Sequence, residues 1–199
     1  MKERGMIFNA EMVRAILDGR KTQTRRPVKF PLIDKNMGCE LAGNELAGEL
    51  AAHNYWNSPY GKLGDRIWVR ETFRVHSRAT DVATLVYRAS VRNSWTEQTH
   101  RVPVAVCNTP ATPEKWTPSI HMPRWASRIT LEITGVRVER LNSITESDAE
   151  AEGVTDTGFG DLLVDGYRYL WKSIYGEESW AANPWVWVIE FKRVEGGAA

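Results

Sequence analysis

Hydrophobic and polar residues alternate with a period of two in several short segments of the chain, which predicts β-strands. The clearest case is residues 129–134, where isoleucine and leucine alternate with threonine and glutamate. At Gly135 the phase changes, and the apolar series continues one residue out of step through 136–138. A glycine at such a change of phase is typical of a β-bulge, which bends a strand as a small barrel requires.

Other strands are expected over residues 6–8, 66–73, 85–87, 102–106 and 185–192. In the second of these, aliphatic side chains alternate with Trp68 and Arg70, so one face is aliphatic and the other is aromatic and cationic. The sequence leaves open which of these two faces points into the core.

An apolar period of three to four residues predicts helices. One helix begins after Asn9, a favourable N-cap, and ends at Gly19. A shorter one begins after Thr145, with Asp148 as the acidic partner in a capping box, and ends at Gly153. Further helices are expected over residues 45–52 and 161–175.

Strands interrupted by short helices, without a βαβ rhythm, predict an α+β fold built on a small β-barrel with short helices around it. The length of 199 residues and the hydrophobic content of 42% fit a single domain over residues 1–199. Residues 30–60 and 76–118 lack continuous periodicity, and we interpret them as two large loop insertions.

Several classes of protein are disfavoured by composition. No apolar run approaches the roughly 18 residues of a membrane span, and no apolar stretch follows the charged N-terminus as in a signal peptide. We therefore expect a cytoplasmic protein without a membrane partner. The four histidines are scattered and the two cysteines have no partner at ligand spacing, so no metal site and no cofactor are expected.

Charge is unevenly distributed although the formal net charge is only +1. The segment 19–26 is basic, whereas 139–152 is strongly acidic. The basic segment is either a solvated turn after a helix, with cations near the negative helix end, or a ligand site that holds a phosphate or a carbonyl. The nine tryptophans either stack on bases or pack at the ends of the barrel.

Two hydroxyl groups, those of Thr22 and Thr24, also belong to the basic segment. A threonine is a weak nucleophile unless a base lies beside it, and Lys21 with a lowered pKa is the local candidate for that base. Nucleophilic catalysis is therefore one hypothesis for this segment.

Residues 9–27, with the core Leu-x-Gly-Arg-Lys-Thr-x-Thr, resemble the opening signature of the ASCH family, whose fold is a PUA-like β-barrel. Further segments match in the family's order: Gly64-Asp65, the acidic helix 145–153 and the closing strand 187–191. Residues 67–71 and 118–125 are similar to a longer branch common in phages and prophages. Compact members lack most of the two insertions.

One branch of the ASCH family hydrolyses the amide of N4-acetylcytidine with a lysine, a threonine and a glutamate. The resemblance implies these catalytic roles for Lys21, Thr24 and Glu152. Thr24 would attack the acyl carbonyl, Lys21 would accept its proton, and Glu152 would orient the lysine or pass a proton to the leaving amine. The large insertions depart from that small, open branch, so they either cover the site, reshape it or make it a pure binding surface.

The expected substrate-binding residues come from the basic segment, from the strand 66–73 and from the proline-bounded loop 118–125, which we expect to close onto the ligand. They are Arg20, Arg25, Arg26, Trp68, Arg70, Glu71, His121, Arg124 and Trp125.

The function that these features indicate is binding of RNA or a modified nucleobase or nucleoside in a cleft between the 19–26 loop and the 145–153 helix. Hydrolysis of an N4-acylcytidine-type amide is an additional activity that the sequence leaves open. The alternatives are a non-catalytic RNA-binding module, a ribonuclease, and a phage accessory protein that binds a host protein.

Overall fold

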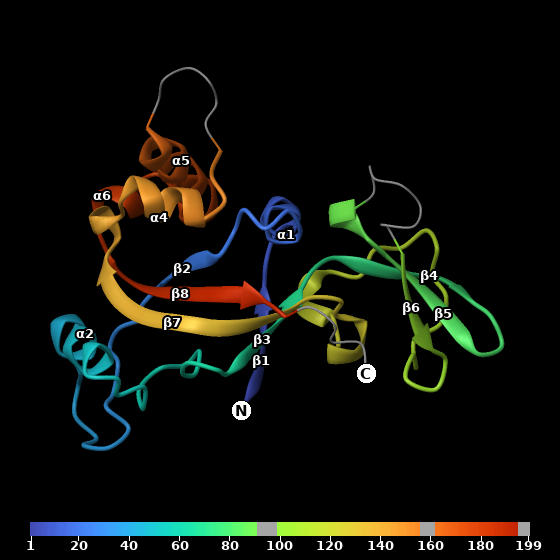
Figure 1. Cartoon of the computed structure of the whole chain (residues 1–199), viewed down its shortest axis with the longest axis horizontal. Coiled ribbons are helices and arrows are strands. Elements are labelled where there is room, and N and C mark those ends of the chain that lie inside the picture. Colours follow the sequence, from blue (N-terminus) through green and yellow to red (C-terminus); the bar gives the residue numbers. More distant parts are fainter. Residues whose placement is uncertain (91–98, 156–161, 195–199) are drawn as a thin grey trace. The chain divides into compact units, whose positions relative to one another are not determined.

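The computed structural model describes residues 1–90, 99–155 and 162–194 (Figure 1). Its strands are β1 (Glu3–Ile7), β2 (Gln23–Pro27), β3 (Arg66–Arg70), β4 (Phe73–Arg78), β5 (Val82–Tyr87), β6 (Thr99–Pro103), β7 (Thr130–Arg140) and β8 (Trp185–Arg193). Its α-helices are α1 (Ala10–Leu17), α2 (Gly43–Ala51), α4 (Glu146–Ala151), α5 (Leu163–Tyr175) and α6 (Glu178–Ala181). Short 3₁₀ turns are η1 (Arg88–Ser90), η2 (Ser119–His121), η3 (Arg124–Ala126) and η4 (Leu141–Ser143). The expected α+β class is confirmed.

The strands form two sheets, one of five strands in the order β1-β3-β7-β8-β2 and one of three in the order β4-β5-β6. In the larger sheet β1 and β3 are parallel, whereas β2 and β8 are antiparallel with Thr24 opposite Ile189. Among the described residues, this sheet has β1 and β2 at its ends and is not closed into a ring. None of the described helices combines the length and apolarity needed to cross a membrane.

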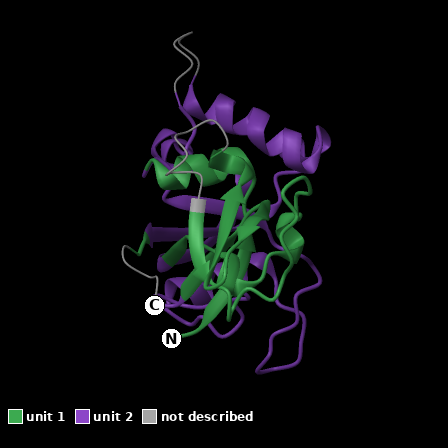
Figure 2. Ribbon diagram, turned by 90° about the vertical axis from the view of Figure 1, so that its right-hand side faces the viewer, with its two compact units in different colours: residues 1–18, 66–131, 193–199 green, residues 19–65, 132–192 purple. Residues whose placement is uncertain are grey.

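The chain divides into two compact units, which Figure 2 shows in different colours. Unit 1 contains residues 1–18, 66–131 and 193–199, and unit 2 contains residues 19–65 and 132–192. The single domain expected over the whole chain stays a prediction.

Unit 1 has its core on one face of the three-stranded sheet, where Phe73, Leu85 and Tyr87 are buried together. Two strands of this sheet, β5 and β6, lie within the expected insertion 76–118, where the sequence predicted strands over residues 85–87 and 102–106. In β3 the aliphatic side chains are buried, while Trp68 and Arg70 are half-buried on the other face. The question that the sequence left open for this strand is thereby answered.

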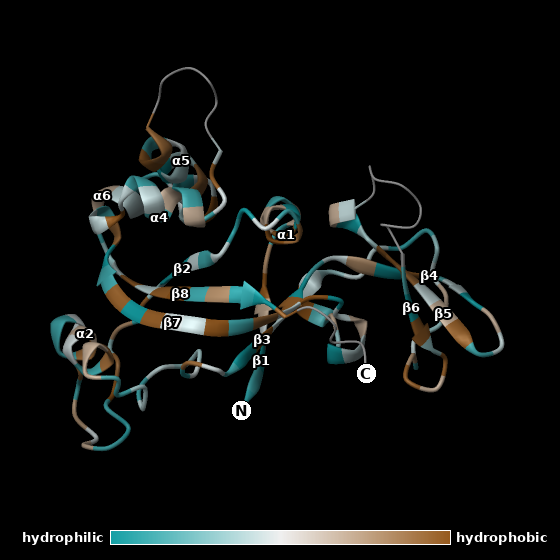
Figure 3. Cartoon of the chain, in the orientation of Figure 1, coloured by the Kyte–Doolittle hydropathy of each residue, from teal (hydrophilic) through white to brown (hydrophobic). Residues whose placement is uncertain are grey.

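Unit 2 packs α4 and α5 against each other and against β8, with Tyr167, Trp171 and Val188 in its core. Figure 3 shows hydrophobic residues recurring along β7 and β8. In β7 the buried positions change from 131 and 133 to 136 and 138, so the expected phase shift at Gly135 is confirmed. The helix expected over 45–52 is α2, with bounds shifted by one to two residues.

Candidate functional site

The basic segment turns out of α1 at Gly19, whose φ of 75° lies in the left-handed region that favours glycine. The chain then enters β2 at Gln23. Because successive side chains of a strand point to opposite faces, Gln23 and Arg25 share the face that contacts α4. Thr24 therefore lies on the opposite face of β2, where it is buried.

Helix α4 is held at its start by a capping box between Thr145 and Asp148, as the sequence predicted. The backbone N–H of Asp148 donates to the hydroxyl of Thr145 at 3.1 Å, and the backbone N–H of Thr145 donates to the Asp148 carboxylate at 3.1 Å. The carboxylate of Glu146 accepts from the backbone N–H groups of Leu163 and Val164 at 2.7 and 3.2 Å. These bonds fix both the start of α4 and the start of α5.

Lys21 and Glu152 meet inside unit 2 at the end of α4. The ammonium of Lys21 donates to Glu152 Oε2 at 2.7 Å and to the Glu152 carbonyl at 2.8 Å, and the two side chains are 0% and 2% exposed. The backbone N–H of Thr22 donates to the Ala151 carbonyl at 2.8 Å. Burial away from water lowers the pKa of Lys21, although the Glu152 carboxylate acts in the opposite direction.

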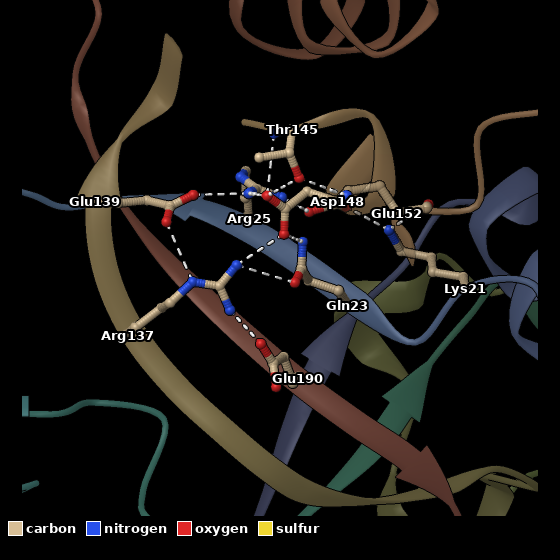
Figure 4. Close-up of polar contacts among 9 residues, drawn as sticks. All are labelled: Lys21, Gln23, Arg25, Arg137, Glu139, Thr145, Asp148, Glu152 and Glu190. Carbon is tan, nitrogen blue, oxygen red and sulfur yellow. Dashed lines mark hydrogen bonds and ion pairs between the residues drawn. The ribbon is translucent and has the colours of Figure 1, made fainter. Parts of the chain in front are cut away.

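A chain of alternating charges extends from this pair, and Figure 4 shows it. The guanidinium of Arg25 is 3.2 Å from Glu152 Oε1, 2.7 Å from Glu139 Oε1 and 3.3 Å from Asp148 Oδ2. Arg137 continues the chain to Glu139 at 3.2 Å and to Asp148 at 2.8 Å, and it also pairs with Glu190. We call these residues the ion-pair network: Lys21, Arg25, Arg137, Glu139, Asp148, Glu152 and Glu190.

Asp148 joins the capping box to the ion-pair network. Partial burial acts to raise its pKa, but the hydrogen bonds from Thr145 and the nearby Arg25 guanidinium outweigh it and lower the pKa of Asp148 to about 2. The carboxylate therefore stays ionised under ordinary conditions and keeps α4 attached to β2.

A pocket of about 550 Å³ lies beside the network within unit 2. The basic segment contributes Gly19, Arg20 and Thr22, and the other lining residues come from α4, the residues after it and the start of α5: Ser147, Glu150, Ala151, Val154, Thr155 and Leu163. Hydroxyl, carboxylate and guanidinium groups thus meet a small apolar surface. The cleft expected between the 19–26 loop and the 145–153 helix corresponds to this pocket.

The three expected catalytic residues are brought together only in part. Lys21 and Glu152 are in direct contact, whereas Thr24 lies on the other face of β2. Within the described part of the chain, none of the three lines the pocket, and the threonine that does so is Thr22. Their catalytic roles stay a prediction.

The expected binding residues of the basic segment separate according to the alternation of β2. Arg20 lines the pocket and donates to the Gly153 carbonyl at 3.1 Å. Arg25 is buried in the ion-pair network, and Arg26 is half-buried on the face of β2 that carries Thr24, opposite Trp187 in the register.

The remaining expected binding residues belong to unit 1. Arg70 stacks on Trp68 at 5.4 Å and donates to the Ser119 and Ile120 carbonyls. Trp125 packs edge-on against Phe73 at 6.3 Å and lies half-buried against the core of unit 1.

Three more of the expected binding residues in unit 1 are an exposed histidine and two charged residues that form ion pairs. His121 is exposed on η2. Arg124 pairs with Glu3 at 3.0 Å, and Glu71 is buried in a bidentate pair with Arg128 at 2.9 and 3.0 Å. Ligand contacts of these residues stay predictions.

Sequence reasoning missed most of the pocket and the network at residue level. The spacing of Asp148 from Thr145 predicted a helix cap, and this was the only local signal that Asp148 gave. It did not indicate that the carboxylate also belongs to the ion-pair network. Arg137 and Glu190 lie on different strands, and only the strand pairing brings them together. Ser147 and Glu150 lie on an exposed helix face whose relation to the basic segment no local pattern reveals.

Metal-ligating side chains were also considered. Within residues 1–90, 99–155 and 162–194, no group of three or more His, Cys, Asp and Glu side chains is arranged to hold a metal ion.

Comparison with known proteins gives no matching family model and no matching curated protein. Two solved structures are similar. One is an ASCH domain from Lactobacillus crispatus JV V101, with 13% identity, a TM-score of 0.42, and coverage of 96% of this chain and 79% of that one. The other is protein EF3133 from Enterococcus faecalis V583, with 12% identity, a TM-score of 0.42, and coverage of 98% and 81%. The sequence motifs resemble the ASCH family named by the first, but at this similarity the two structures give no information about ligand or residue roles.

Proposed function

We propose that the chain binds a nucleobase-containing molecule, RNA or a nucleoside, in the pocket between the basic segment and α4. The observation that carries this proposal is the pocket itself, because it joins Arg20 and Thr22 to Ser147 and Glu150 within one compact unit. Its volume of about 550 Å³ is within the range of ligand sites for small molecules.

The lining groups match the parts of a nucleotide. The Glu150 carboxylate is an acceptor for an exocyclic amino group, which is how carboxylates read cytosine edges. Arg20 supplies a cation for a phosphate, and the hydroxyls of Thr22 and Ser147 suit a ribose or a carbonyl. Val154 and Leu163 give an apolar surface for the flat face of a base.

The test uses a substitution that places a large side chain in the pocket without changing the charge of the lining residues. Calorimetric titration with CMP, AMP, GMP and UMP would be compared between the wild type and Ala151→Phe, because Ala151 lines the pocket. The control is Ala52→Phe, at an exposed position just after α2. Binding by the wild type and the control, with loss of about tenfold or more in Ala151→Phe, is expected. Equal affinities in all three proteins would contradict the proposed site.

Hydrolysis of an acylated amine is the second candidate, and the contact between Lys21 and Glu152 supports it. A buried lysine with a lowered pKa is a suitable base. With Lys21 in its neutral amine form, a threonine oxygen would bond to the acyl carbon and pass its proton to that amine. The C–N bond would then break as the amine takes a proton, and water would hydrolyse the resulting ester.

Threonine variants test this candidate more cleanly than Lys21→Ala, which would disturb the ion-pair network. Release of acetate from N4-acetylcytidine would be followed with the wild type, Thr24→Val and Thr22→Val, which keep side-chain shape. Activity lost only in Thr24→Val supports the expected nucleophile, and activity lost only in Thr22→Val assigns that role to the pocket threonine. A folded wild type without turnover removes hydrolysis of this substrate.

A further inference from the structure

The β4-β5-β6 sheet of unit 1 has one face that the core uses only in part, at Val86. Pairing of Val75 with Leu85 and of Phe73 with Tyr87 places these side chains on the core face. The alternate positions form the other face, which we call the outer face; its side chains include Arg74, Ser77, Thr84 and Arg101. Figure 1 shows the three strands side by side.

A polar row crosses the outer face from one edge strand to the other. Ser77 on β4 pairs with Thr84 on β5, and Thr84 pairs with Arg101 on β6. Ser77 and Arg101 are exposed and Thr84 is half-buried. Val86 lies on the same face but is only 2% exposed, so the accessible part is the half around this row.

An arginine and a tryptophan stack beside the row. The guanidinium of Arg74 lies 4.6 Å from the ring centre of Trp116, and both residues are half-buried. The segment that carries Trp116 is fixed along the edge of β4, because the N–H groups of Thr112 and Thr117 donate to the Val75 and Phe73 carbonyls at 2.9 and 2.7 Å. The aromatic ring is therefore held in position without a ligand.

The charge around this sheet is positive. Residues 73–88 and 99–118 contain five Lys and Arg residues, Arg74, Arg78, Arg88, Arg101 and Lys115, and two acidic ones, Asp81 and Glu114. This excess contrasts with the near-neutral chain as a whole, whose net charge is +1. A polyanion is the complementary partner.

We propose that the outer face binds the backbone of single-stranded nucleic acid. Arg101 and the hydroxyls of Ser77 and Thr84 contact phosphates, and Trp116 with Arg74 provides a surface on which an accessible base stacks. A duplex hides the faces of its bases between neighbouring base pairs, and an acidic peptide has no base that could stack on Trp116. Single-stranded nucleic acid is therefore the partner that this face favours. This surface is separate from the pocket of unit 2, and its inference does not depend on the function proposed there.

The test measures fluorescence anisotropy of a labelled twelve-residue oligouridine over a series of salt concentrations. Arg101→Glu is expected to weaken binding about tenfold or more, and loss of one phosphate contact lowers the slope of log K against log salt by about 0.7. Arg101→Lys keeps the charge and is expected to stay within about threefold of the wild type. The control is Arg168→Glu, at an exposed position of α5 in unit 2.

Equal loss of affinity in Arg101→Glu and Arg168→Glu, or no loss in either, would overturn the proposal. So would displacement of the oligouridine by poly-glutamate as efficiently as by unlabelled oligouridine, because that result assigns the face to acidic proteins. The thermal unfolding midpoint of each variant is measured as a control. A midpoint equal to that of the wild type shows that a change in affinity arises at the surface and not from misfolding.

Discussion

Buried ion pairs occur in both units, but they are organised differently. In unit 1, Glu71 forms a bidentate pair with Arg128, whose guanidinium also donates to Ser90 Oγ at 2.9 Å and lies 4.1 Å from the ring centre of Tyr87. In unit 2, Glu152 contacts two cations, Lys21 and Arg25, and the series of pairs continues to the partly exposed Glu190. Among residues 1–90, 99–155 and 162–194, the ion pair of Glu71 therefore joins one acid to one cation and is isolated from other ion pairs, whereas Glu152 belongs to a network.

The difference indicates different roles. An isolated buried pair costs desolvation that only its own geometry offsets, so it serves to lock two segments together. A network shares each charge among several partners, so that one substitution leaves the others paired. The network of unit 2 also lies beside the pocket. Thr22, which follows Lys21 in sequence, and Ala151, which precedes Glu152, both line the pocket. We infer that it holds the two walls of the pocket in place.

The largest expected effect is in unit 1. Arg128→Met leaves the Glu71 carboxylate, which is 2% exposed, without its bidentate partner, and is expected to cost about 3–5 kcal/mol of unfolding free energy. Urea unfolding measures it. The double variant Glu71→Leu with Arg128→Met removes the unpaired charge and is expected to regain part of the loss. A single variant with wild-type stability would contradict the isolated-pair description.

A smaller loss is expected when one cation is removed from the network. In Lys21→Met, Glu152 keeps its 3.2 Å contact with Arg25, so the expected cost is about 1.5–3 kcal/mol, the range for hydrogen bonds to charged groups. Urea unfolding gives the value, with Lys29→Met at an exposed position as the control. A loss equal to that of Arg128→Met would show that the network gives no redundancy.

The pH dependence of stability is expected to differ in sign between the two regions. The pKa of Asp148 is lowered to about 2 from 3.8, so its contribution is complete above pH 3.8 and is lost as the pH falls through 2. Burial raises the pKa of Glu71, against the effect of Arg128, so its charged form costs stability as the pH rises above 4.5.

Unfolding free energies of Asp148→Asn and Glu71→Gln, each subtracted from the wild type across pH 2–7, measure these contributions. The destabilisation by Asp148→Asn is expected to shrink as the pH falls toward 2. The difference for Glu71→Gln is expected to change in the opposite direction with pH above 4.5. The same direction in both variants would contradict the assignment.

The smallest expected effect concerns the outer end of the network. A Cβ at Gly135 would come within 2.6 Å of the Glu190 carboxylate, and the end of that side chain can move. Gly135→Ala is therefore expected to displace Glu190 from Arg137 at a cost of about 0.5–1 kcal/mol, typical of a partly exposed pair. Thermal unfolding at low and high salt checks it, because the loss should nearly vanish at high salt.

Local signals in the sequence predicted much of the fold. The caps at Asn9 and Thr145 and the phase shift at Gly135 are each encoded within a few residues, and the structure confirms all three. The three-stranded sheet was less visible because its strands are short and a register shift between Val75 and Ser77 interrupts the alternation of β4.

The candidate site was predictable only as far as local sequence describes it. The resemblance to the ASCH family implied a cleft between the basic loop and the acidic helix, and a pocket lies between these two segments. The alternation of β2 separates Thr24 from Lys21, and that separation depends on where the strand begins, which spacing alone does not determine. Pairs between strands, such as Arg137 with Glu190, depend on sheet order.

The most direct test of the proposed binding site is a ¹H–¹⁵N NMR titration of the wild-type protein with CMP. Binding in the pocket predicts that the largest chemical-shift changes fall on the amides of Arg20, Thr22, Ser147 and Ala151. These changes should saturate together, and those of unit 1 should be small. Saturating changes confined to other residues, or none at millimolar CMP, would contradict the assignment of this pocket as the ligand site.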